Sequence, residues 1–344
     1  MGKYYDGTKL LSLKDINGNT PEIYICTSNR TAGKTTYFNR MVVNRFKRTG
    51  EKFALLYRYK YEIDGCVDKF FGDINSLFFP TDEMTSISRA SKSYIELLLN
   101  GKSCGYVITL NSADLLKKYS HMFSDVGSII FDEFQSETND YCPEEIRKFM
   151  SIHTSIARGQ GEQVRYVPVY MISNPVTIIN PYYTEFGIST RLQSNTKFLR
   201  GDGWVLEQGH NESAEEAQAQ SAFMRAFAGN SYTKYSMQGV YLNDNLSFVE
   251  KLTGKSKYIC TILYKGKQFA IREFTNENLV YCDESVDSNF PVKITISSAE
   301  HTNNFAMMRT QPFLIEQLRM CFEYGNFRFR NLNCKEAVLK LVSY

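Results

Sequence analysis

Residues 23–46 read IYICTSNRTAGKTTYFNRMVVNRF. The apolar run at residues 23–26 is typical of a buried strand. A helical pattern follows over residues 35–48, where large apolar side chains recur on one face before a glycine ends the run. The polar residues 28–35 therefore connect the end of a strand to the beginning of a helix.

This connection has the composition of a phosphate-binding loop. Backbone N–H groups and the helix N-terminus would form a cradle for a β-phosphate. Gly33 lets the backbone approach, Lys34 reaches the β- and γ-phosphates, and the Thr35 hydroxyl ligates Mg²⁺. Ser28 stands where the motif usually has its first glycine, so a chance Gly-Lys-Thr at a helix start is the alternative. The predicted nucleotide-binding residues are Ser28, Asn29, Arg30, Thr31, Ala32, Gly33, Lys34, Thr35 and Thr36.

A second apolar run, SIIFDE at residues 128–133, ends in two carboxylates. At the carboxyl edge of a parallel sheet, Asp132 would complete the Mg²⁺ shell with Thr35, and Glu133 would polarise the attacking water. Two solvated acids at a strand end are the alternative. An acid pair that follows a phosphate loop at this separation favours ATP hydrolysis, with ATP and Mg²⁺ as cofactors. No guanine-specifying Asn-Lys-x-Asp follows a strand, so adenine is the expected base.

The first two hundred residues alternate between strand and helix patterns, which predicts a parallel sheet flanked by helices. The class is α/β, with a P-loop NTPase core. The predicted strands are residues 23–26, 53–58, 106–110, 128–131 and 167–172.

The length of 344 residues favours at least two domains. We predict an ATPase domain at residues 1–200 and a linker or lid at 201–244. The lid contains one helix, 213–228, anchored by Phe223 and Phe227. A small α+β domain at 245–344 follows. Its predicted elements are a hairpin (258–264 and 268–274), a strand (279–282) and helices (311–324 and 334–342).

Composition excludes several other classes of protein. Hydrophobic residues make up 43% and charged residues 22%, as in ordinary globular chains. No apolar run approaches the ~20 residues of a membrane-spanning helix, and the polar start lacks a signal-peptide core, so a cytosolic protein is expected. The 8 cysteines and 4 histidines are scattered, which argues against zinc or a Cys/His nucleophile. A net charge of +3 means that any grip on nucleic acid comes from local clusters.

Further candidates are polar residues at strand ends and basic residues in loops. Ser173 and Asn174 follow a buried strand and could sense the γ-phosphate, or the Asn-Pro pair could simply end the strand. Arg158 lies in a glycine-flanked stretch from which a guanidinium could reach a neighbouring subunit's phosphate. Surface charge is the alternative for Arg158, and also for the other basic candidates. These are Lys117, Lys118, Arg58 and Lys60, of which Arg58 and Lys60 are also candidate DNA contacts.

This combination resembles the genome-packaging ATPases of small short-tailed phages of Gram-positive bacteria, relatives of the large terminases. The resemblance spans the first ~200 residues, judged by motif order, and is weaker beyond them. It rests on the phosphate loop, residues 53–60, the acid-ending strand with Phe134, Ser173-Asn174-Pro175-Val176 and residues 179–183.

The resemblance implies a homo-oligomeric ring, with five subunits expected, that binds the portal of a procapsid and pulls double-stranded DNA inward. ATP would lie between subunits. Arg158 then resembles an arginine finger acting in trans, with Arg165 as its rival, and Lys118 a second trans-acting residue. The protein would occupy the host cytoplasm and, transiently, the portal vertex, and be absent from the mature virion. Whether an RNA adaptor takes part stays open, and no membrane partner is expected.

The family's second domain resembles a ribonuclease-H-like nuclease that has lost its active site. A two-metal nuclease needs several converging carboxylates, and residues 258–264 contain none, so no nuclease activity is expected. Lys265 and Lys267 belong to a basic cluster that could track DNA phosphates, or could form a solvated hairpin face. Two other functions stay open: a helicase-like translocase, and a nucleotide-gated scaffold without hydrolysis.

Overall fold

The computed structural model describes residues 4–342 except 90–93, 119, 139, 159–160, 162, 179, 190, 193–195, 229, 231–232, 234–235 and 238–247. Its contacts divide the chain into two compact units, Met1–Asp244 and Asn245–Tyr344. In the described residues no helix is long and apolar enough to span a membrane.

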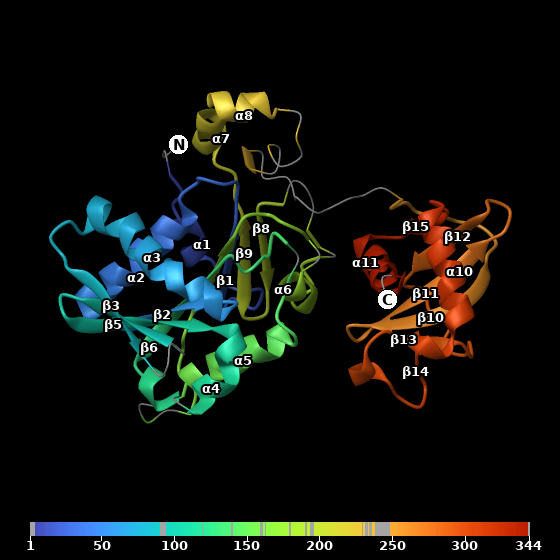
Figure 1. The fold of residues 1–344 in the computed structure, drawn as a ribbon, viewed down its shortest axis with the longest axis horizontal. Helices are drawn as coiled ribbons and strands as arrows, with labels where there is room; N and C mark the ends of the chain where they lie inside the picture. The colour runs from blue at the N-terminus through green and yellow to red at the C-terminus, as the bar shows by residue number, and fades with distance from the viewer. Residues whose placement is uncertain are drawn as a thin grey trace. The chain divides into compact units, whose positions relative to one another are not determined.

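The first unit is built on a nine-stranded sheet with the order β3-β4-β5-β2-β6-β7-β1-β9-β8 (Figure 1). Six strands, from β5 to β9 in that order, pair in parallel, while β3, β4 and β8 add antiparallel edges. The strands are β1 (Ile23–Thr27), β2 (Lys52–Tyr57), β3 (Met84–Arg89), β4 (Tyr94–Leu99), β5 (Lys102–Thr109), β6 (Val126–Asp132), β7 (Val169–Ser173), β8 (Phe198–Gly201) and β9 (Trp204–Gln208).

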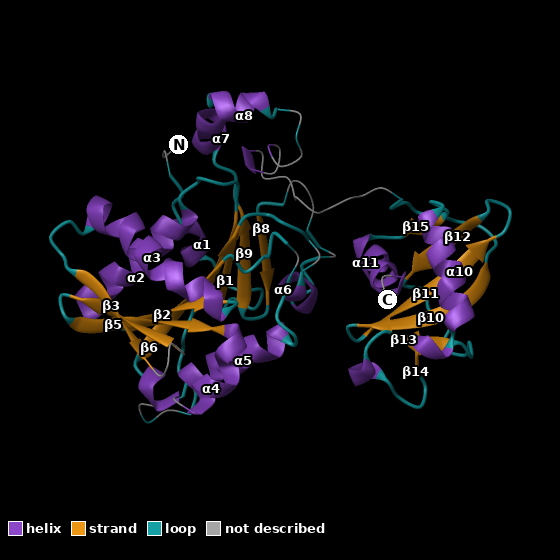
Figure 2. Cartoon of the chain, in the orientation of Figure 1, coloured by secondary structure: helices purple, strands orange, loops and turns teal. Residues whose placement is uncertain are grey.

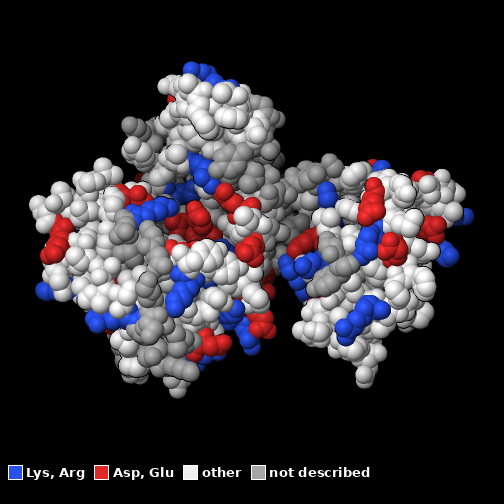
Figure 3. All heavy atoms as spheres, in the orientation of Figure 1, with Lys and Arg blue, Asp and Glu red and all other residues white. Residues whose placement is uncertain are grey.

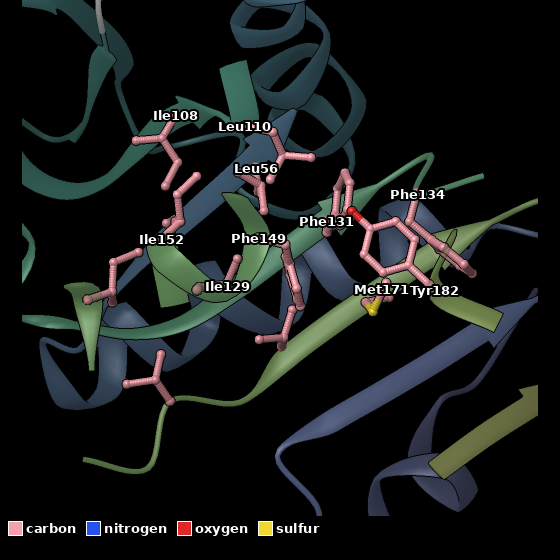
Figure 4. Close-up of a cluster of buried hydrophobic side chains, with 14 of the residues drawn as sticks. Leu56, Ile108, Leu110, Ile129, Phe131, Phe134, Phe149, Ile152, Met171 and Tyr182 are labelled. Atoms are coloured by element: carbon pink, nitrogen blue, oxygen red, sulfur yellow. The ribbon is translucent and has the colours of Figure 1, made fainter. Parts of the chain in front are cut away.

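Helices cover both faces of this sheet, as Figure 2 shows. The helices are α1 (Thr8–Ser12), α2 (Lys34–Thr49), α3 (Ile63–Phe78), α4 (Ala113–Lys118), α5 (Glu145–Ile156), α6 (Pro181–Glu185), α7 (Glu212–Ala219) and α8 (Ala222–Ala226). Because successive strand residues face opposite sides, β6 sends Ile130 to the core under α2 and α3. Ile129 and Phe131 face the other core, with Phe149 of α5 and Tyr182 of α6 (Figure 4).

The second unit is a six-stranded mixed sheet with two helices packed on it. The sheet has the order β14-β13-β10-β11-β12-β15. Ile315 and Leu318 of α10, and Val338 and Leu341 of α11, belong to its core. The elements are β10 (Lys257–Tyr264), β11 (Lys267–Phe274), β12 (Leu279–Asp283), β13 (Lys293–Thr295), β14 (Ala306–Met307), β15 (Phe327–Phe329), α10 (Pro312–Glu323) and α11 (Leu332–Val342).

The α/β class, the five predicted parallel strands and the C-terminal hairpin are confirmed. Two predictions for residues 201–244 are wrong. β9 pairs in parallel with β1, so a boundary at residue 200 would separate two strands of one sheet. The predicted single helix is two short ones, and Phe223 and Phe227 are 71% and 51% exposed, so they anchor nothing in a core. Their rings pack on each other instead, 5.1 Å apart.

Candidate nucleotide site

The loop between β1 and α2 folds around the ammonium of Lys34. Gly33 adopts a left-handed φ of 92°, which glycine accepts without strain, and α2 begins at the next residue. Lys34 Nζ donates to the Ser28 carbonyl and hydroxyl, both at 2.9 Å, and to the Asn29 carbonyl at 3.1 Å. Burial lowers the pKa of Lys34 to about 8. A buried cation held by loop oxygens is positioned to bind an anion delivered to the same loop.

Thr35 and Asp132 meet beside this lysine, as predicted. The Thr35 hydroxyl donates to the two carboxylate oxygens of Asp132 at 3.3 and 3.2 Å. Burial and the neighbouring charge of Glu133 raise the pKa of Asp132 to about 6. A hydroxyl and a carboxylate are hard oxygen donors, and Mg²⁺ at phosphate sites takes one or two such protein ligands. The donor set therefore fits Mg²⁺ held together with phosphates.

Glu133 lies just beyond the end of β6 and is exposed. Its φ is +51°, a left-handed value that is uncommon for residues other than glycine. Its N–H donates to Asp132 Oδ1 at 3.0 Å. The Asp132 carboxylate therefore accepts from both the Thr35 hydroxyl and the Glu133 N–H.

Ser173 is the last residue of β7, which lies between β6 and β1, and Asn174 follows it. Asn174 Oδ1 accepts a hydrogen bond from Lys34 Nζ at 3.3 Å. Ser173 Oγ is buried and has no hydrogen-bond partner within the described residues. Both side chains therefore lie at the phosphate end of the site, where a sensor must be.

Most of the predicted nucleotide-site residues line one pocket of about 830 Å³, but Ser28 and Asn29 are not among its lining residues. Its polar end contains Arg30 to Thr36, both acids, Ser173 and Asn174. Helices α2 and α3 add the aromatic and apolar side chains of Tyr37, Leu77 and Phe78 to its lining, together with the charged Arg40, Lys69 and Asp73. An adjoining pocket of about 540 Å³ shares Arg30, Lys69 and the two acids. Figure 3 shows acidic side chains beside basic ones in the hollow on this face of the first unit.

Arg58, a candidate DNA contact in the sequence, is buried in the first unit. It is 5% exposed. Its guanidinium pairs with Glu145 at 2.9 Å and donates to the backbone carbonyl of Phe134 at 2.7 Å. Burial disfavours the charged form, but the hydrogen bonds and charge of Glu145 outweigh it, so the pKa of Arg58 is raised. No sequence signal could identify Glu145, because it lies 87 positions away as one acid of an amphipathic helix.

The two candidate finger arginines lie at the opposite edge of the sheet. Arg165 donates to the carbonyls of Val126, at 3.2 Å, and Ile156, at 2.8 Å, and its N–H to Ala157 at 2.8 Å. Val126 begins β6 and Asp132 ends it, so these residues are separated by about 20 Å along the strand. Arg158 follows Ala157 and is exposed.

The other basic candidates are spread over both units. Lys118 ends α4, and its side chain is outside the described part. Lys60 begins a short 3₁₀ helix after β2, at the edge that carries the nucleotide site. Lys265, in the turn between β10 and β11, pairs with Glu336 at 2.8 Å, and Lys267 begins β11.

A parallel sheet that ends in a phosphate loop, an acid pair and a polar strand terminus defines a nucleotide-binding protein of the P-loop class. Residues 1–343 match the family model of the podovirus DNA encapsidation protein (Gp16), and the chain belongs to that family. It is 25% identical over 332 residues to the DNA packaging protein of Bacillus phage phi29, covering 95% of this chain and 93% of that one. To the DNA packaging protein of Bacillus phage B103 it is 26% identical over 306 residues, covering 88% and 90%.

Two solved structures share the fold along the whole chain. The bacteriophage Phi-29 viral genome packaging motor assembly aligns with a TM-score of 0.70 and 23% identity, covering 99% of this chain and 100% of that chain. The Phi-28 gp11 DNA packaging motor aligns with a TM-score of 0.62 and 15% identity, covering 99% and 98%. At these identities the likeness concerns the fold.

Proposed function

We propose that this protein hydrolyses ATP between subunits of a ring and couples the hydrolysis to the movement of double-stranded DNA into a phage procapsid. The observation that carries the proposal is the meeting of Lys34, Thr35, Asp132 and Glu133 at one pocket. The family and the DNA packaging relatives support the DNA substrate.

Each residue of the pocket has a separate task in this reaction. The loop N–H groups and Lys34 bind the β- and γ-phosphates, and Thr35 with Asp132 would hold Mg²⁺, which neutralises charge on those phosphates when bound. Glu133 orients a water and accepts its proton as the water attacks the γ-phosphorus and ADP leaves. Asn174, hydrogen-bonded to Lys34, is placed to respond when the γ-phosphate departs.

Arg158 is proposed to act on a neighbouring subunit. It follows Ala157, whose carbonyl accepts from the Arg165 N–H, and Arg165 contacts Val126 at the start of β6. Val126 is about 20 Å along the strand from Asp132, which is farther than an arginine side chain reaches. Arg165 already uses its guanidinium on two backbone carbonyls, so Arg158 is the better finger. A ring of copies, with five expected, would supply the finger in trans.

The partners follow from the same proposal. The motor binds duplex DNA and the portal of a procapsid in the host cytoplasm, and leaves before the virion matures. We propose DNA or portal contact for the C-terminal unit rather than nuclease activity, because Thr261 occupies the middle of β10 and Asp283 is paired with Arg272 at 3.0 Å. Lys60, Lys267 and Lys118 are the basic candidates for contact with DNA or a neighbouring subunit.

The test is steady-state ATP hydrolysis by the wild type, Glu133→Gln and Arg158→Ala, with and without duplex DNA. We expect each variant to lose about 1,000-fold in kcat. A one-to-one mixture should recover part of the activity, because mixed rings contain interfaces with an intact Glu133 and an intact Arg158. Arg147→Ala, an exposed arginine of α5, is the control and should match the wild type.

A wild type that binds ATP without turnover would replace the motor with a nucleotide-gated scaffold. Activity in the mixture no greater than the sum of the separate variants would exclude a finger in trans. Strand separation by the active wild type would favour a helicase.

A further inference from the structure

The guanidinium of Arg58 holds the backbone of the turn that contains Glu133. Nη1 donates to the Glu133 carbonyl at 3.3 Å and Nη2 to the Phe134 carbonyl at 2.7 Å. Nε faces the other way and donates to the two oxygens of Glu145 at 2.9 and 3.1 Å. One buried side chain thus connects the first residue of α5 to the turn after β6.

The glutamate turn depends on such support. Glu133 has a left-handed φ of +51°, and residues held there persist only when their surroundings determine the conformation. Within the described residues its carboxylate makes no hydrogen bond, so its direction depends on the backbone of the turn and on the nearby charges of Lys34 and Asp132. Besides Arg58, the backbone bonds of the turn are the Glu133 N–H to Asp132 and the Phe134 N–H to Ile172, at 3.3 Å.

Both carboxylate oxygens of Glu145 accept further hydrogen bonds, which fixes Glu145 and thereby keeps Arg58 in one position. Its Oε1 accepts from the Tyr182 hydroxyl at 2.9 Å and its Oε2 from the Cys142 N–H at 2.8 Å. The Tyr182 ring packs edge-on against Phe131, Phe134 and Phe149 (Figure 4). A satisfied, buried carboxylate in an aromatic setting has no alternative rotamer at low cost.

We propose that Arg58, held by Glu145, is a positioning residue that sets the direction of the Glu133 carboxylate during ATP hydrolysis. Its guanidinium donates to Glu145 and to the backbone of the turn, and it acts through the backbone of Glu133. The inference rests on the proposed ATPase function. It replaces the DNA contact predicted for Arg58.

The test is a double-mutant cycle between Arg58→Lys and Glu133→Gln. Lysine keeps the charge opposite Glu145 but lacks the planar fork that reaches Glu145 and two carbonyls together. We expect Arg58→Lys to lower kcat by about 30-fold or more while KM changes less than about threefold. In the Glu133→Gln background the same change should alter the residual kcat by less than about threefold, because Arg58 acts only through Glu133.

The rates are expressed per folded site. The number of folded sites is measured from the binding stoichiometry of a non-hydrolysable ATP analogue, so that misfolded protein does not contribute. Glu145→Gln is a second variant that loosens Arg58 without removing it, and it should lower kcat in the same way. Arg147→Lys is the control: it makes the same substitution at an exposed arginine of α5 that pairs with Glu144, and should keep kcat within about threefold.

An unchanged kcat per site in both Arg58→Lys and Glu145→Gln overturns the inference and leaves the ATPase standing. Losses that multiply with that of Glu133→Gln also overturn it, because they place Arg58 in an independent role. A wild type without turnover, or a Glu133→Gln variant with full activity, overturns the ATPase proposal and this inference with it.

Discussion

At the scale of single residues, the burial of Lys34 lowers the stability of the folded protein and prepares the site to bind phosphate. Its ammonium is buried and held by the Ser28 and Asn29 oxygens, yet burial lowers its pKa to about 8. The charged form is therefore less favourable in the folded protein than in the unfolded chain. A bound nucleotide phosphate would offset the free-energy cost of burying the Lys34 ammonium. The buried charge is therefore explained by nucleotide binding rather than by folding stability.

This predicts a pH-dependent difference in stability between the wild type and Lys34→Met. Between pH 8 and the ordinary lysine value of 10.5, the folded protein holds fewer protons on Lys34 than the unfolded chain. The penalty is therefore complete below pH 8 and is relieved as pH rises. From pH 7 to pH 10, the wild type should gain roughly 2 kcal/mol in unfolding free energy relative to Lys34→Met. Urea unfolding of both nucleotide-free proteins measures the difference, and a constant difference would contradict the burial.

At the scale of elements, the phosphate loop is tied to the segment that follows β9. Asn29 is fully buried; its Nδ2 donates to the carbonyls of Asn211, at 3.0 Å, and Met237, at 3.1 Å, and its Oδ1 accepts from the Asn211 N–H at 2.9 Å. Gln218 of α7 donates to the Arg30 carbonyl at 3.1 Å. These hydrogen bonds join the segment after β9 to the phosphate loop.

Asn29→Ala tests this connection. The change leaves three half-buried backbone groups without their partner, so we expect a loss of about 1–3 kcal/mol in unfolding free energy. We also expect faster proteolysis within residues 209–237. ATP should slow this cleavage in the wild type but not in Asn29→Ala. The control is Asn17→Ala, which removes one exposed hydrogen bond to Asp202 and should cost less than about 0.5 kcal/mol. Equal proteolysis of the wild type and Asn29→Ala would show that the anchor does not control the segment.

At the scale of the whole molecule, the two units have separate cores. The first has a buried core on each face of the nine-stranded sheet, and the second has its own core between its sheet and α10 and α11. The chain has one tryptophan, Trp204, which is buried on β9 beside β1. Its fluorescence therefore reports the unfolding of the first unit alone.

We predict two thermal transitions, of which Mg·ATP shifts only one. A ligand stabilises the unit that binds it, by about 2.7 kcal/mol at a concentration 100 times its Kd. The midpoint followed by Trp204 fluorescence should rise with Mg·ATP, while the other calorimetric transition stays in place. A single transition that shifts as a whole would mean that the units unfold together. Lys34→Met is the matched control, since it should abolish the shift.

The sequence alone determined the parts whose chemistry is local. The phosphate loop, the acid pair and the central strands depend on residues adjacent in the chain, because strand and helix periods and loop composition are set by neighbours. Parallel pairing then brings the carboxyl ends of β1, β6 and β7 to one edge, so Lys34, Asp132 and Asn174 could be expected to meet.

Which charges are buried, and which edge of the sheet each loop occupies, could be learned only from the three-dimensional structure. In the sequence, Arg58 comes at the end of a strand, where a surface residue is expected. In the structure it is buried, because Glu145 of α5 forms an ion pair with it. Phe223 and Phe227 had helical spacing but no core to enter. The position of Arg158, near the sheet edge where β6 begins, became evident from the contact of Arg165 with Val126. Burial and ion pairing depend on residues far apart in the chain, and a single sequence carries no local pattern for them.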